Sequence, residues 1–119
     1  MLIIRRPQRE ALQAGLDRRF VRSLVARLIE EFPGTLSGVA NDLEADARTA
    51  LGRARAHGLR EDRDLVAFVE VALLVSPRFD EHPAFAAALR DQAVPPEHRM
   101  DALLATLTDE AWDEASRLR

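Results

Sequence analysis

The stretch of sequence that decides the fold spans residues 12–34 and is LQAGLDRRFVRSLVARLIEEFPG. Its large apolar residues recur every three or four positions, which is the period of an α-helix. Pro33 and Gly34 end the pattern, because both residue types interrupt helices. The apolar positions cover more than half of the helix circumference, so we expect a long central helix that is covered on several sides. They are Leu12, Leu16, Phe20, Val21, Leu24, Val25, Leu28, Ile29 and Phe32.

A second helix is predicted over about residues 41–57. Asn41 is a good N-cap residue, and Gly58 supplies the left-handed conformation that commonly ends a helix. The expected buried stripe is narrow and made of small residues, so a neighbouring helix can approach closely. It consists of Leu43, Ala47, Ala50, Leu51 and Ala54.

A third helix is predicted over about residues 61–75. The frequent valines also fit a β-strand, but Leu65, Phe68 and Ala72 follow the helical period, so we predict a helix. Acidic residues occupy its first turns, where they interact favourably with the helix dipole. They are Glu61, Asp62 and Asp64.

Three shorter helices are predicted in the remaining sequence. Pro83 opens one over about residues 83–92, and a pair of prolines opens the next over 95–107. Thr108 is a suitable N-cap for a last helix over 109–118. Only Leu2, Ile3 and Ile4 could form a strand, and one strand cannot make a sheet. The predicted fold is therefore an all-α, compact bundle of about five to six helices in a single domain, residues 1–119.

The sequence offers no pattern that predicts an active site. There is no cysteine, so thiolate nucleophiles and cysteine-held metals are excluded. His57, His82 and His98 lack the i, i+4 spacing of a helical metal site, and the adjacent residues 80–82 seldom converge on one ion. No serine lies in a nucleophile elbow, and there is no glycine-rich phosphate loop. We therefore predict a protein that is not an enzyme and has no cofactor or metal.

Positive charge is concentrated near the start of the chain. The net charge is −3, yet residues 1–30 contain seven arginines and three acidic residues. The arginines could form a basic patch that grips phosphates, which keeps a small nucleic-acid-binding helical protein open as an alternative function. The negative net charge argues against that alternative. The patch would consist of Arg5, Arg6, Arg9, Arg18, Arg19 and Arg22.

Large apolar residues are also frequent in the second half of the chain. Most are expected in the core of so small a domain, but any that stay exposed would form a face for a protein partner. The candidate partner-binding residues are Phe79, Phe85, Met100, Leu104 and Trp112. A homo-oligomer is also compatible with such a face.

No membrane segment is predicted. Unbroken apolar runs, such as residues 71–75, are only five or six residues long and far shorter than a span. Near the first residue, the arginines follow the short apolar run, which is the reverse of a signal peptide. We therefore expect a soluble, cytoplasmic protein.

The segment between the second and third predicted helices, residues 53–64, is RARAHGLREDRD. With Ile4-Arg5 and Gln8, Phe32-Pro33, and PRFDEHP at residues 77–83, it resembles a family of small, mostly uncharacterised helical proteins. Those proteins are encoded in type VI secretion and polymorphic-toxin gene neighbourhoods of Gram-negative bacteria. The similarity covers roughly residues 3–90. Two positions depart from the pattern: His57 stands at the aromatic position before Gly58, and Arg60 stands where a threonine or serine often opens the helix.

The resemblance implies a function but no catalytic residues. It implies a non-catalytic accessory protein, an adaptor or chaperone, that binds a secretion-system effector or a spike-associated component. An immunity protein that neutralises a cognate toxin is the alternative from the same gene neighbourhoods. In either case the expected partner is another protein that is encoded nearby.

Overall fold

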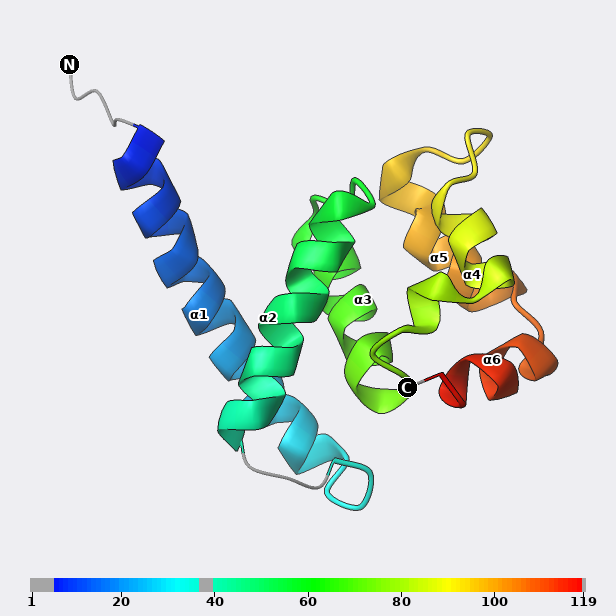
Figure 1. The fold of residues 1–119 in the computed structure, drawn as a ribbon, viewed down its shortest axis with the longest axis horizontal. Helices are drawn as coiled ribbons and strands as arrows, with labels where there is room; N and C mark the ends of the chain where they lie inside the picture. The colour runs from blue at the N-terminus through cyan, green and yellow to red at the C-terminus, as the bar shows by residue number, and fades with distance from the viewer. Residues whose placement is uncertain (1–5, 37–39, 119) are drawn as a thin grey trace.

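The structure is a computed structural model that describes residues 6–36 and 40–118; of residues 6–10, 40 and 41 it describes the backbone alone. These residues form six α-helices, one short 3-10 helix and no strand, which confirms the predicted all-α bundle of five to six helices (Figure 1). The helices are α1 (Arg6–Glu31), α2 (Ala40–Ala56), α3 (Asp62–Leu74), η1 (Phe79–Glu81), α4 (Pro83–Leu89), α5 (Pro96–Thr106) and α6 (Asp109–Ser116). In the described part of the chain, none is both long and apolar enough to cross a membrane.

Local sequence signals explain most helix ends. Gly58 has a φ of +88°, the left-handed conformation expected after α2. The Thr108 side chain accepts a hydrogen bond from the Ala111 amide at 3.2 Å and so caps α6 as predicted. The predicted cap Asn41 instead lies inside α2, and its side chain is outside the described atoms. The fourth predicted helix is shorter than expected, because α4 ends at Leu89.

Helices α1, α2 and α3 run alternately in opposite directions, and α4, α5 and α6 cover the other side of α3 (Figure 1). The predicted stripe of small residues on α2 is confirmed, since Ala47, Ala50 and Ala54 are buried. A row of aromatic rings extends through the core from α3 to α4. Centroids are 4.7 Å apart for Phe68 and Phe79, and 5.7 Å apart for Phe79 and Phe85.

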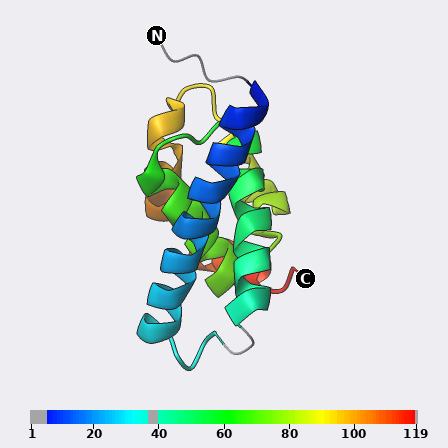
Figure 2. The same cartoon turned by 90° about the vertical axis from the view of Figure 1, so that its left-hand side faces the viewer.

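The two halves of α1 lie in different environments. In the second half, Val21, Leu24 and Leu28 are buried against the rest of the bundle. In the first half, Leu12 is 57% exposed and Leu16 is 50% exposed. The prediction of a central helix covered on several sides is therefore wrong for this half. The reason is that α1 packs mainly on α2 at the edge of the molecule, while the last three helices pack beyond α3 (Figures 1 and 2).

Candidate functional site

The first candidate site is the uncovered apolar face of α1, which we define as Leu12, Leu16 and Phe20. These residues are four positions apart and therefore lie along one side of the helix. Phe20 is partly buried against the core, so the face continues from solvent into the interior. A groove of about 290 Å³ runs beside it. Its lining includes Leu16, Asp17 and Phe20 of α1, Leu51 and Arg55 of α2, and Leu65 of α3.

An ion pair fixes the position of α1 beside this groove. Arg55 donates two hydrogen bonds to the Asp17 carboxylate, with N–O distances of 2.6 and 2.8 Å. Gln13 donates a third to the same carboxylate at 2.9 Å. The Arg55 hydrogen bonds outweigh burial and lower the pKa of Asp17, so the pair stays charged at neutral pH. This contact holds the first half of α1 near α2 although its leucines remain exposed.

Part of the predicted basic patch lies on the same helix. Arg18, Arg19 and Arg22 are exposed on α1. Arg6 and Arg9 belong to its first turns, but their side chains are not among the described atoms. Arg5 lies outside the described residues. The patch as a whole therefore stays a prediction.

The predicted partner-binding residues of the second half do not form one exposed face. The side chains of Phe79, Phe85 and Met100 are fully buried, so they belong to the core and are not available to a partner. Trp112 is partly buried, with its ring edge-on to Phe85 at a centroid distance of 4.8 Å. Only Leu104, which is 47% exposed, is an exposed apolar residue of this set.

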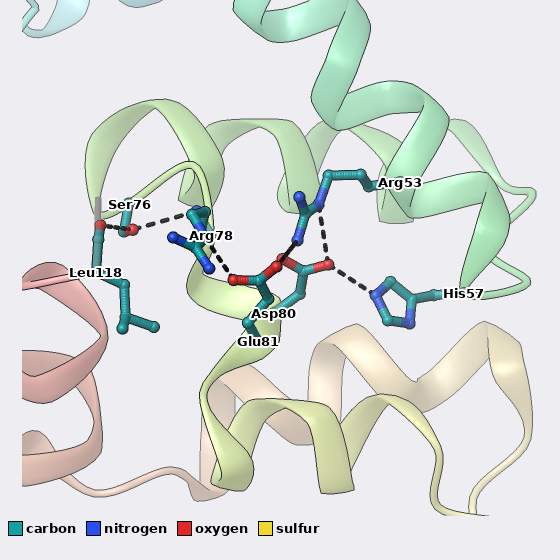
Figure 3. A network of polar contacts seen from close by, with 7 residues as sticks. All are labelled: Arg53, His57, Ser76, Arg78, Asp80, Glu81 and Leu118. Atoms are coloured by element: carbon teal, nitrogen blue, oxygen red, sulfur yellow. Dashed lines mark hydrogen bonds and ion pairs between the residues drawn. The ribbon is translucent and has the colours of Figure 1, made fainter.

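A polar network joins the end of α2 to the turn before α4 (Figure 3). Asp80 is buried and accepts hydrogen bonds from Arg53 at 2.6 and 3.2 Å and from His57 Nε2 at 2.9 Å. Burial is the largest single influence and raises its pKa. The Arg53 and His57 hydrogen bonds together outweigh burial, so the pKa lies below its ordinary value. Asp80 is therefore an ionised, fully engaged carboxylate.

Glu81 and His82, which follow Asp80 in the sequence, make hydrogen bonds of their own. Glu81 accepts a hydrogen bond from Arg78 at 2.5 Å. His82 accepts from the Ala84 amide through Nδ1 and donates to Glu114 through Nε2. Glu81 also pairs with Arg53 at 3.6 Å, whereas His82 contacts neither Arg53 nor His57. Across the described residues, no group of three or more His, Asp or Glu side chains is placed to hold a metal ion.

The residues that carry the sequence resemblance meet in this network. Arg53 and His57 come from the 53–64 segment, and Asp80 comes from the PRFDEHP turn. Ser76 donates to the Leu118 carbonyl and accepts from the Arg78 amide at 3.2 Å, so the network also reaches the last turn of the chain (Figure 3). Its geometry indicates a packing role, because every carboxylate in it pairs with a cation.

Comparisons with known proteins leave the chain without an assigned family. No protein-family model matches it, and searches of curated proteins and of solved structures also find no match. The family resemblance described from the sequence therefore stays a prediction.

Proposed function

We propose that this protein is a non-catalytic accessory protein that binds a partner protein through the uncovered apolar face of α1. The observation that carries the proposal is the exposure of Leu12 and Leu16 on a helix whose second half enters the core. Single exposed leucines are common on protein surfaces. Here two of them continue into partly buried Phe20 and an adjoining groove, and contiguous apolar surface is typical of interaction sites.

The occupant that fits this face best is an amphipathic helix of the partner. A row of apolar residues four positions apart packs against a similar row on a second helix. Arg19 is exposed and lies three positions after Leu16, on the same side of α1. The matching helix would therefore combine apolar residues with aspartate or glutamate beside them, because charge complementarity favours the correct partner.

For the identity of the partner, the proposal relies on the resemblance predicted from the sequence. The family that residues 53–64 and 77–83 resemble is encoded in type VI secretion and polymorphic-toxin gene neighbourhoods, which implies proximity to genes of secreted effectors. We therefore propose that the partner is a secretion-system effector or a spike-associated component that is encoded nearby. The protein would act on it as an adaptor or chaperone, without chemistry of its own.

Co-expression with each protein encoded beside it tests this proposal. We expect one neighbour to co-purify with the wild-type chain and to be lost with the double variant Leu12→Gln/Leu16→Gln. Glutamine keeps helix propensity and removes the apolar surface. The matched control is Leu104→Gln, which changes an equally exposed leucine on α5 and should retain the partner.

Two results would contradict the proposal. One is a chain that stays a solitary monomer with every neighbour, and the other is a complex that Leu104→Gln disrupts while the α1 double variant does not. Growth of cells that express a toxic neighbour separates the accessory role from the immunity alternative, because only an immunity protein restores growth.

A further inference from the structure

Asp64 is a buried carboxylate to which the described residues offer no hydrogen-bond donor. It lies in the first turn of α3 and is 1% exposed. Within the described residues, neither of its carboxylate oxygens accepts a hydrogen bond. Buried polar groups are almost always paired, because an unpaired one loses its hydration without compensation. The group therefore requires a physical explanation.

Asp64 lies in the wall of a pocket of about 430 Å³, which is within the size range of small-ligand sites. The pocket lies between the turn that joins α2 to α3 and the first residues of α5. Its lining consists of Gly58, Arg60, Glu61, Asp64, Pro96 and Glu97. It is separate from the apolar face of α1 and from the Asp80 network.

The charges around the pocket favour a cation. Three of the six lining residues are acidic, and Arg60 is the one basic residue among them. Arg63, which follows Asp62 in the same helical turn, donates instead to Asp101 of α5 at 3.0 Å. Burial, together with Asp101 and Glu61, raises the pKa of the Asp64 carboxyl, whereas Arg63 and His98 oppose that shift. The charges of the protein therefore do not compensate Asp64 fully.

We propose that this pocket binds an alkylguanidinium or alkylammonium group, whose charge pairs with the buried Asp64 carboxylate. Both Asp64 oxygens are covered in the free protein, so pairing requires the side chain to turn toward the pocket. A guanidinium would then donate two parallel hydrogen bonds to oxygens that receive none from the described residues. Gly58 and Pro96 offer apolar atoms for an aliphatic stem. Such a group can belong to a free amine or to an arginine or lysine side chain of a second protein. The inference goes beyond the proposed function, since it concerns a different surface.

Asp64→Asn is the informative variant because it preserves the shape of the side chain and removes its charge. In the free protein, an unpaired buried charge destabilises the fold. We therefore expect Asp64→Asn to raise the midpoint of thermal unfolding at neutral pH while it weakens cation binding at least about tenfold. If Asp64 served only to stabilise the fold, Asp64→Asn would instead lower the midpoint of thermal unfolding.

The experiment is an NMR titration of the full chain with agmatine and, separately, with the capped peptide acetyl-Gly-Arg-Gly-amide. We expect saturable shifts of the Gly58, Glu61 and Asp64 amides at about millimolar ligand or below. Tighter binding of agmatine assigns the site to a free amine, and tighter binding of the peptide assigns it to a protein side chain; either supports the proposal. Asp113→Asn, an exposed carboxylate on α6, is the control and should change neither binding nor the unfolding midpoint.

Two outcomes would overturn the proposal. The first is a titration in which neither ligand shifts these amides in the wild-type chain. The second is an Asp64→Asn variant that binds as tightly as the wild type, or that unfolds at a lower temperature than it. Because the measurement needs no partner protein, it is independent of the complex proposed for α1.

Discussion

Replacement of Asp80 by asparagine is the perturbation that tests the packing of the bundle most sharply. The substitution keeps the volume of the side chain but removes the negative charge that Arg53 and His57 share. It therefore separates the energy of the ion pair from that of filling space between α2 and the turn before α4. We expect a clear loss of stability without a change of fold.

The size of the loss follows from the geometry. Removing one partner of a fully buried ion pair costs about 3–5 kcal/mol. The Asp80 side chain is 5% exposed, but that of Arg53 is 33% exposed. Water can therefore hydrate the Arg53 guanidinium in the variant and replace part of the lost interaction with the carboxylate. We therefore expect Asp80→Asn to lower the free energy of unfolding by about 2 kcal/mol at pH 7. For a chain of this length, that corresponds to a thermal midpoint lower by about 8 °C.

Urea denaturation of the wild type and the variant measures this difference, and its pH dependence checks the cause. The pKa of Asp80 is lowered in the folded state, so its contribution is present above its unfolded pKa, near about 4, and is lost as the pH falls through the folded value. The difference between the two proteins should therefore persist at pH 5 and shrink only in stronger acid.

Glu81→Gln is the matched control, since Glu81 is the exposed acidic neighbour that pairs with Arg53 at 3.6 Å and with Arg78. Exposed pairs contribute at most about 1 kcal/mol. The reasoning is refuted if Asp80→Asn costs less than Glu81→Gln, or if its effect does not depend on pH down to strong acid.

Substitutions at four further positions test the fold. Val69→Asp buries an unpaired charge at a fully buried position and should abolish the cooperative thermal transition; Leu24→Asp should do the same, and a normal melting curve for either would refute the core assignment. Gly58→Ala should cost about 1 kcal/mol in urea denaturation, solely because of its left-handed backbone, since an added Cβ would meet no atom within 4 Å. Thr108→Ala should also cost about 1 kcal/mol through loss of the α6 cap, and Thr108→Ser should restore most of it; equal losses for both would contradict the capping role.

Much of the helical architecture could be predicted from the sequence because local chemistry determines it. Pro83 and Pro96 occupy the first turns of α4 and α5, Thr108 caps α6, and Gly58 follows α2. Each of these residues affects only the backbone next to it, so a few neighbouring residues of the sequence are enough to predict the helix end. The helical period of α3 likewise prevailed over its valine content.

The parts that could not be predicted depend on distant residues. The period of α1 predicts an apolar stripe, but whether Leu12 is covered depends on where the last three helices pack. The 3-10 turn at residues 79–81 is held by Arg53, far away in the sequence. An aspartate in the first turn of a helix is also typical of a favourable dipole interaction, and that pattern does not distinguish exposed Asp62 from buried Asp64.

The central claim is that the uncovered face of α1 binds a partner protein, and the most direct test is the dissociation constant of the purified complex. About half of the surface of Leu12 and of Leu16 is exposed in the free protein and would be buried in the complex. Replacing both leucines should therefore cost roughly 2–3 kcal/mol of binding free energy. Calorimetry should then show that Leu12→Gln/Leu16→Gln binds roughly 30- to 150-fold more weakly than the wild type, and that Leu104→Gln is unchanged. Wild-type affinity for the α1 double variant would contradict the claim.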